Sequence, residues 1–186
     1  PSHQFPLGIS MPIGRRVELL NFANRAEGRY IIEDDYDSEF RYIRKPIPSL
    51  QSIDNNGKVI YIGTFSTSIA PSVRISYMVL PIRLLNDYHK IYSEFSSEVS
   101  ILEQKMVARF IAEGNYEKHL NKMRKLYKDK RGHLIKELSA LGDSIQIIGE
   151  SAGNHLLIKL LTMNSENDMC LAAGKNGVKV YPVANY

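Results

Sequence analysis

Short apolar runs alternate along this chain with longer segments in which apolar residues recur at helical spacing. The short runs occupy residues 30–32, 59–63 and 75–80, and each ends in polar residues or proline. Continuous β-branched runs of this length are typical of strands buried on both faces of a parallel sheet. The pattern therefore predicts three buried strands in the first half of the chain.

Helical spacing appears first in residues 17–23 and then across 83–141, where Gly114 and Asn115 divide the pattern into two segments. The second segment predicts one long amphipathic helix, closed by residues 142–143, with a single polar gap around Arg131. Its apolar stripe consists of Leu120, Met123, Tyr127, Leu134, Leu138 and Leu141. Residues 41–57, rich in proline, asparagine and aspartate, are expected to form an irregular connection.

After the long helix the composition changes. Residues 144–148 and 155–160 resemble strands, 165–173 a short helix, and 178–181 a last strand. We expect an α/β fold with a mostly parallel central sheet and flanking helices, followed by part of a smaller α+β unit. The boundary is expected within the long helix, between 120 and 140. We place it after residue 125, so that 1–125 belong to a large domain and 126–186 begin a small one.

Charge, cysteine content and histidine spacing bear on three properties: nucleic-acid binding, disulfide formation and metal binding. The net charge is +4, and eight lysine or arginine residues lie within 117–136. That density is compatible with nucleic-acid binding, but a solvated basic face on an amphipathic helix is the favoured interpretation. A lone Cys170 excludes an internal disulfide and fits a reducing cytoplasm. The five histidines show no metal-ligand spacing with acids or cysteine: His3, His89, His119, His133 and His155.

An acidic cluster follows the first predicted strand. Asp34 is expected at the carboxyl end of that strand, where open α/β sheets place their ligands. A carboxylate there can accept a hydrogen bond from a protonated pyridine nitrogen, and Tyr36 can donate to a ring oxygen. The alternative is an acidic turn with only a structural role, and the cluster alone favours that alternative.

A second polar run follows the next predicted strand. Thr64 and Ser66 supply hydroxyl groups, and Arg74 can form a fork of hydrogen bonds to phosphate oxygens. Together with Asp34 and Tyr36, these side chains form the set that an anionic, pyridine-based cofactor requires. A serine- and threonine-rich loop with a structural arginine explains each residue singly but not their combination.

A family resemblance covers most of the chain: it is strong from 1 to 81, continues through 116–124 and weakens after 151–155. The residues that carry it most clearly lie in the first of these ranges. They include PSHQFPLG at 1–8, IIEDDYDSEF at 31–40, PSLQ at 48–51 and GTFS at 63–66, followed by RISYMVLP at 74–81. These motifs resemble the MocR/GabR branch of GntR-type bacterial transcription regulators. That resemblance implies a fold-type-I pyridoxal-phosphate transferase-like domain, joined in the whole protein to a winged-helix DNA-binding domain.

Carried over by position, the resemblance assigns Asp34 to the pyridine nitrogen and Tyr36 to the ring oxygen of pyridoxal 5'-phosphate. It assigns Thr64, Ser66 and Arg74 to the phosphate. Two positions depart from catalytic aminotransferases: Phe5 stands where an asparagine is usual, and Thr67 stands where the family has its reactive lysine. A threonine hydroxyl cannot form an imine with an aldehyde or shuttle the α-proton.

Three functions follow from these residues. The first is an effector-sensing domain of a transcription regulator that binds pyridoxal phosphate, or its adduct with an amino acid, non-covalently. The second is an aminotransferase acting on an amino acid, against which Thr67 and Phe5 argue. The third is a scaffold or dimerisation module without the ligand. Loss of the cofactor in favour of another small anion and an engineered Thr67 both stay open.

The resemblance further implies a homodimer in which the subunits share pocket residues, with DNA bound through a domain outside this chain. Because the chain begins with Pro1 rather than methionine, we expect it to be an internal piece of a longer protein.

Overall fold

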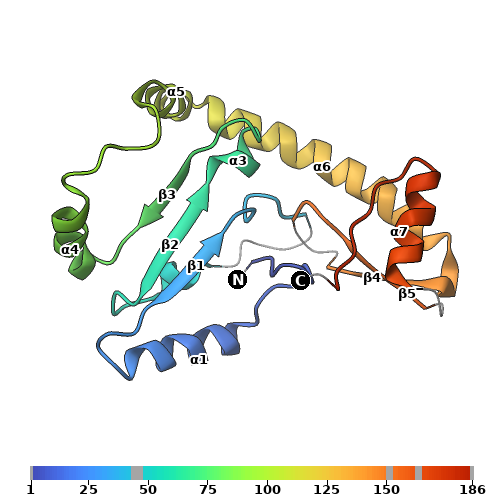
Figure 1. Cartoon of the computed structure of the whole chain (residues 1–186), viewed down its shortest axis with the longest axis horizontal. Helices are drawn as coiled ribbons and strands as arrows, with labels where there is room; N and C mark the ends of the chain where they lie inside the picture. Colours follow the sequence, from blue (N-terminus) through green and yellow to red (C-terminus); the bar gives the residue numbers. More distant parts are fainter. Residues whose placement is uncertain (1, 43–47, 150–152, 162–164, 185–186) are drawn as a thin grey trace.

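The computed structural model describes residues 2–42, 48–149, 153–161 and 165–184, and contains two separate sheets linked by one long helix (Figure 1). The first sheet has three strands in the order β1-β2-β3, and the second has two. This arrangement confirms the α/β fold expected from the sequence.

The first sheet is mixed. Strands β1 (Ile31–Asp35) and β2 (Val59–Thr64) are parallel, whereas β3 (Ser76–Val79) is antiparallel to β2. The prediction of three strands was correct, but the prediction that both faces are buried was wrong. All four residues of β3, the strand at the end of the order β1-β2-β3, are exposed, and Ile32 of β1 is 66% exposed. Burial of a strand's side chains depends on which elements cover the faces of the sheet, and a run of apolar residues does not report that.

A small core holds the first sheet against two helices. Leu20 of α1 (Ile13–Asn24) packs with Leu50 of α2 (Leu50–Ile53) and Val59 of β2, and Ile31 and Ile53 close the cluster. Helix α2 lies in the segment expected to be irregular. Ser49 caps its N-terminus, because the Ser49 side chain accepts a hydrogen bond from the backbone N–H of Ser52. Residues 43–47 of that segment lie outside the described residues.

Three helices, not two, follow the first sheet: α4 (Ile82–Tyr92), α5 (Ile101–Ala112) and α6 (Asn115–Ser139). The break at 93–100 was not predicted, although this stretch contains four serines, which compete for backbone hydrogen bonds and disfavour helix interiors. Gly114 precedes α6 with a φ of 72°, a left-handed conformation that glycine adopts without steric cost.

Helix α6 runs from the side of the first sheet to the second, as Figure 1 shows. There, β4 (Ile145–Ile148) pairs with β5 (Leu157–Leu160) in antiparallel fashion, and α7 (Glu166–Lys175) follows. The last predicted strand, at 178–181, is wrong, since these residues are not assigned to a strand. No helix in the described ranges is long and apolar enough to cross a membrane.

The polar gap in the apolar stripe of α6 has a structural explanation. Arg131 is only 9% exposed, and its guanidinium donates to the carbonyl oxygens of Gly149, Gly153 and His155. The arginine therefore takes the place of an apolar residue and ties α6 to the segment between β4 and β5.

Candidate cofactor site

Strands β1 and β2 end side by side. Their parallel register pairs Asp34 with Ile62 and Asp35 with Gly63, and Thr64 is the last residue of β2. Because the carboxyl ends of parallel strands meet at one edge of a sheet, Asp34 and Thr64 lie at the same edge, where ligands bind in open α/β folds. The short helix α3 (Phe65–Ser68) starts immediately after Thr64.

Two acids of the cluster after β1 are satisfied within the chain. Glu33 is 2% exposed and accepts hydrogen bonds from the backbone N–H groups of Leu50 and Gln51, at 2.7 and 2.9 Å. Asp37 is also 2% exposed, and its Oδ2 lies 2.7 Å from Nδ1 of His3. These two carboxylates hold the fold together and are not available to a ligand.

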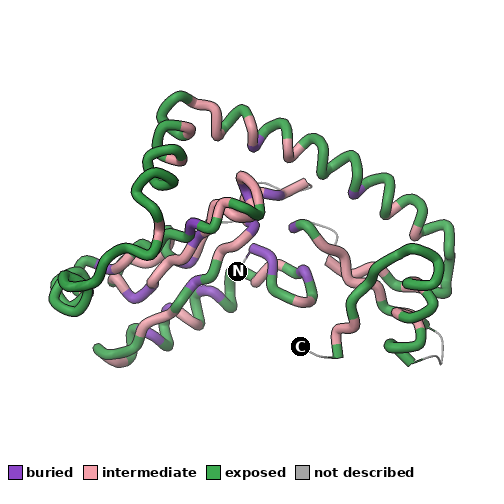
Figure 2. Tube along the Cα trace, turned by 45° about the horizontal axis from the view of Figure 1, so that its top comes forward, coloured by how far each residue is buried: buried purple, intermediate pink, exposed green. Residues whose placement is uncertain are grey.

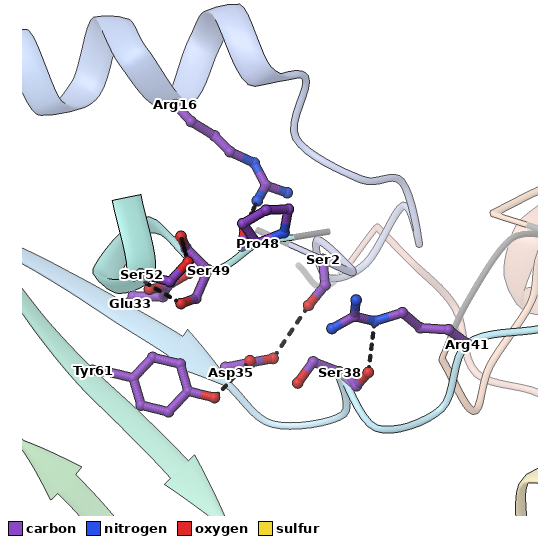
Figure 3. A pocket seen from close by; sticks show the side chains of 10 residues that line it. All are labelled: Ser2, Arg16, Glu33, Asp35, Ser38, Arg41, Pro48, Ser49, Ser52 and Tyr61. Atoms are coloured by element: carbon purple, nitrogen blue, oxygen red, sulfur yellow. Dashed lines mark hydrogen bonds between the residues drawn. The ribbon is translucent and has the colours of Figure 1, made fainter. Parts of the chain in front are cut away.

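A polar pocket of about 250 Å³ lies on the face of β1 that carries Glu33 and Asp35 (Figure 3). Asp35 accepts hydrogen bonds from Tyr61 Oη at 2.7 Å and from Ser2 Oγ at 3.2 Å, as the dashed lines of Figure 3 show. Arg16 reaches the pocket from α1 and donates to the carbonyl oxygen of Pro48. The charged groups here contact one another or the backbone, so we interpret this pocket as structural.

Asp34 differs from its three acidic neighbours. Successive side chains of a strand point to opposite faces, so Asp34 faces away from the pocket that holds Glu33 and Asp35. It is exposed, and its carboxylate makes no hydrogen bond or ion pair in the described part of the chain. Of the acids in this cluster, Asp34 is therefore the one whose charge is free to meet a ligand.

Tyr36 follows Asp34 on the way out of β1. Its Oη donates to the carbonyl oxygen of His3 at 3.1 Å, so contact with a ligand's ring oxygen would require this proton to be redirected. Burial raises the pKa of Tyr36 to about 12, and the negative charges of Asp37, Asp34 and Asp35 add to the effect. The hydroxyl therefore stays protonated at neutral pH and can act as a donor.

The hydroxyl groups after β2 are already engaged. Thr64 Oγ1 accepts from the N–H of Ser66 at 3.1 Å and donates to the carbonyl oxygen of Ile75 at 3.3 Å, which caps α3. Ser66 Oγ donates to the carbonyl oxygen of Val73 at 2.6 Å and accepts from Arg74 Nη1 at 3.4 Å. The exposed guanidinium of Arg74 keeps its other donors for an anion, whereas Thr64 serves the local backbone.

Three of the predicted residues share one cleft of about 350 Å³. Ser66, Thr67 and Arg74 line it, whereas Asp34, Tyr36 and Thr64 do not. The structure thus brings Ser66 and Arg74, two of the three residues assigned to the phosphate, into one cleft with Thr67, and places the ring-side residues at the end of the neighbouring strand. The rest of the lining was not predicted: Phe40, Ser68, Ile69, Ala70, Pro71, His119, Met123, Tyr127 and Asn154.

His119 is the most informative of these additions. It lies on α6, and its Nε2 is buried without a hydrogen-bond partner among the residues that the structure describes. No sequence pattern connects His119 with Thr67, because their meeting in one cleft depends on how α6 crosses the end of the first sheet. An unpaired buried ring nitrogen in a cleft is a candidate polar contact for a ligand.

The residues present fit pyridoxal phosphate in the chemistry of their donors and acceptors. The unpaired carboxylate of Asp34 suits a protonated ring nitrogen, and the exposed guanidinium of Arg74 suits a phosphate. Thr67 lines the cleft and has no amine. Asp34 and Arg74 thus offer the two charges that the ring and the phosphate call for, but Thr67 offers the aldehyde no covalent attachment.

The histidines make no metal centre in the described ranges, where no group of three potential ligands exists. His3 pairs with Asp37 and lies 4.3 Å from the His155 ring, measured between centroids. Phe5 contacts the same His155 edge-on at 5.7 Å. Cys170 is half-buried, and Tyr181 is 67% exposed.

Residues 3–184 match the model of the family described as aminotransferase class I and II. The chain is similar in structure to a kynurenine aminotransferase from Pyrococcus horikoshii, solved in complex with PMP. The TM-score is 0.82 at 29% identity, covering 96% of this chain and 44% of that one.

Two curated relatives are named as regulators. The chain is 46% identical to an uncharacterized HTH-type transcriptional regulator, YdeL, from Bacillus subtilis, over 99% of this chain and 40% of that protein. It is 35% identical to the probable rhizopine catabolism regulatory protein MocR from Rhizobium meliloti, over 99% and 37%. The chain thus spans about two fifths of the length of these relatives. These matches confirm the resemblance to MocR-type regulators.

Proposed function

Because this chain belongs to the aminotransferase class I and II family and resembles HTH-type regulators over 99% of its length, we propose that it senses an effector for a bacterial DNA-binding transcription regulator. Its ligand is pyridoxal 5'-phosphate or an adduct of that compound with an amino acid, held without a covalent bond. A DNA-binding regulator acts where the chromosome lies, which in bacteria is the cytoplasm.

The observation that carries the proposal is the state of Asp34. Of the four acids from Glu33 to Asp37, Glu33, Asp35 and Asp37 are hydrogen-bonded within the chain, whereas exposed Asp34 has no such partner among the described residues. A charge-assisted hydrogen bond from Asp34 to a pyridinium nitrogen contributes about 1.5–3 kcal/mol to ligand binding. A purely structural scaffold has no need for this exposed carboxylate at the edge of the sheet.

Each remaining residue has a role that does not depend on covalent chemistry. Arg74 binds the phosphate, with Ser66 beside it, and Thr64 fixes the backbone that presents them. Tyr36 orients the ring through its hydroxyl proton. Bound pyridoxal phosphate supplies an electrophilic aldehyde and an electron-withdrawing ring, but at position 67 this chain has no amine to hold or deprotonate a substrate.

The structural similarity to a kynurenine aminotransferase favours one alternative, a working aminotransferase on an amino acid. Thr67 and Phe5 argue against it. Without the lysine, proton transfer alone slows by about 10²–10⁴-fold.

We also propose a homodimer and a division into two domains after residue 125. Large apolar side chains are exposed on α4 and α5: Ile82, Ile101, Leu102 and Ile111. Their exposure supports burial of these helices against another subunit or domain. Helix α6 is continuous across residue 125, so the boundary lies inside a rigid element and not in a loop.

The test uses the full-length protein that contains this chain. Calorimetry with pyridoxal phosphate, and separately with a phosphopyridoxyl amino acid, should detect binding that dialysis reverses, and the bound ligand should alter the affinity for operator DNA. Borohydride treatment of the complex should leave the protein mass unchanged. Absence of heat with both ligands, or a covalent adduct after borohydride, would contradict the proposal. Conversion of an amino acid to its keto acid would favour the enzyme.

A further inference from the structure

Four lysines form a stripe along the outer face of α6: Lys118, Lys122, Lys125 and Lys136, here called the lysine stripe. All four are exposed. At 3.6 residues per turn, these positions lie within about 60° of one another around the helix axis and extend over about 27 Å. Figure 2 shows α6 exposed along most of its length.

The two arginines of the same helix point the other way. Arg124 donates from Nε to the carbonyl oxygen of Glu39 at 2.8 Å, and Arg131 donates to the carbonyl oxygens of Gly149, Gly153 and His155. The basic run predicted from the sequence thus separates into arginines that anchor the helix and lysines that face outward. The lysine stripe makes no ion pair within the described residues.

This arrangement is locally unfavourable for the helix. Lys118 and Lys122 are like charges at i and i+4, and such pairs destabilise a helix by about 0.2–0.5 kcal/mol. Lys118 also lies in the first turn of α6, at the positive end of the helix dipole, where cations are disfavoured. Asp129 is the single acid on this face, and it lies between the charges of Lys125 and Lys136.

We infer that the lysine stripe binds the phosphate backbone of DNA, next to the operator contacted by the regulator's own DNA-binding domain. The inference rests on the proposed function. Duplex DNA carries one negative charge per about 1.7 Å of axis, so a lysine row of about 27 Å faces many phosphates. Ammonium groups on flexible stems suit backbone contacts that carry no sequence information.

The experiment compares three forms of the full-length protein on a long mixed-sequence DNA duplex over a series of salt concentrations. The test variant carries Lys118→Ala, Lys122→Ala and Lys125→Ala. The matched control removes the same charge from exposed lysines outside α4, α5 and α6, with Lys159→Ala, Lys175→Ala and Lys179→Ala. Alanine keeps the helix and removes the repulsion, so thermal stability should not fall.

Each lost phosphate contact lowers the steepness of the log-affinity against log-salt plot by about 0.9. The test variant should therefore show a slope shallower by about 2–3 and an affinity weaker by on the order of 10²-fold at 0.1 M salt, with the control unchanged. Equal slopes for both variants and the parent would overturn the inference and leave the regulator intact. Absence of DNA binding by the parent protein would overturn the proposed function, and the inference with it.

Discussion

Arg131 of α6 donates from Nη2 to the carbonyl oxygen of Gly149 at 2.6 Å, which joins the long helix to the segment that leaves β4. The same guanidinium reaches the carbonyl oxygens of His155 and Gly153, at 3.4 and 3.5 Å. One charged side chain therefore satisfies three backbone acceptors in the described part of the connection between β4 and β5. The second sheet is held to α6 by this contact.

Replacing Arg131 with methionine should lower the free energy of unfolding by about 2–4 kcal/mol, because buried carbonyl groups lose charge-assisted hydrogen bonds. The midpoint of denaturant unfolding of the full-length protein measures the change. Arg15→Met is the control, since Arg15 forms an exposed pair with Glu18 that contributes at most about 1 kcal/mol. Similar losses in both variants would contradict an anchoring role for Arg131.

Asp34→Asn and Asp35→Asn should affect different properties, ligand affinity and stability, although the two residues are adjacent. Asp34→Asn should weaken pyridoxal-phosphate binding by about 10- to 100-fold and leave stability unchanged, because its side chain has no described partner. Asp35→Asn should lower stability by about 1–2 kcal/mol through its bonds to Tyr61 and Ser2 and leave ligand affinity unchanged. Calorimetry and thermal unfolding separate the two. Equal ligand affinity in parent and Asp34→Asn would remove Asp34 from the site.

Thr67→Lys should allow covalent attachment of pyridoxal phosphate, because an amine would then enter the cleft that Ser66 and Arg74 line. Borohydride treatment followed by mass spectrometry should show one added phosphopyridoxyl group at position 67, and none in the parent. Thr67→Lys combined with Arg74→Ala should lose the adduct at low ligand concentration. If the single variant remains unmodified at saturating ligand, the cleft does not present the aldehyde to position 67.

The strands and most helices could be predicted because their signals are local. Apolar runs located β1, β2 and β3, and helical spacing located α1 and α6. The exposure of β3 could not be predicted, since it depends on which elements cover the sheet. A continuous apolar run looks the same in a central strand and an edge strand.

The candidate site was predictable in composition but not in assembly. The motif and the position after β1 identified Asp34, yet nothing in the sequence showed that Glu33, Asp35 and Asp37 would each find a partner and leave Asp34 free. His119 and Asn154 line the cleft because of how α6 and the segment before β5 pack in three dimensions, which no local sequence pattern reports. In the sequence, Arg131 is a polar residue at a position where the apolar stripe predicts an apolar one. Only the fold shows that its guanidinium donates hydrogen bonds to carbonyl groups.

Gly153→Ala should destabilise the protein by about 1–3 kcal/mol. Gly153 has a φ of 76°, and a Cβ at this position would overlap the His3 ring. Gly132→Ala is the matched control. This glycine lies inside α6 with open space around its Cα, so alanine should stabilise by about 0.5–1 kcal/mol. Thermal unfolding of both variants gives the signs, and a neutral Gly153→Ala would show that the junction between His3 and residue 153 is loose.

The stability of this domain should fall on acidification from about pH 7 to about pH 5, in part because of His155. Burial lowers the pKa of the His155 imidazole, and the neighbouring His3 lowers it further. The unfolded chain, with a histidine pKa of about 6.5, then binds more protons than the folded one as the pH drops through that value. Protonation therefore favours unfolding, and the stability contributed by neutral His155 is present above about pH 6.5 and lost below it.

His155→Gln isolates this contribution, because an amide can still donate to the carbonyl oxygen of Pro6, which His155 Nε2 contacts at 3.2 Å. The variant should lose less stability than the parent between the two pH values, as measured by denaturant midpoints. Glu39 works in the opposite sense, since burial raises the pKa of its carboxyl, but it is common to both proteins and cancels in the comparison. An equal or steeper pH dependence in His155→Gln would show that His155 titrates freely in the folded protein.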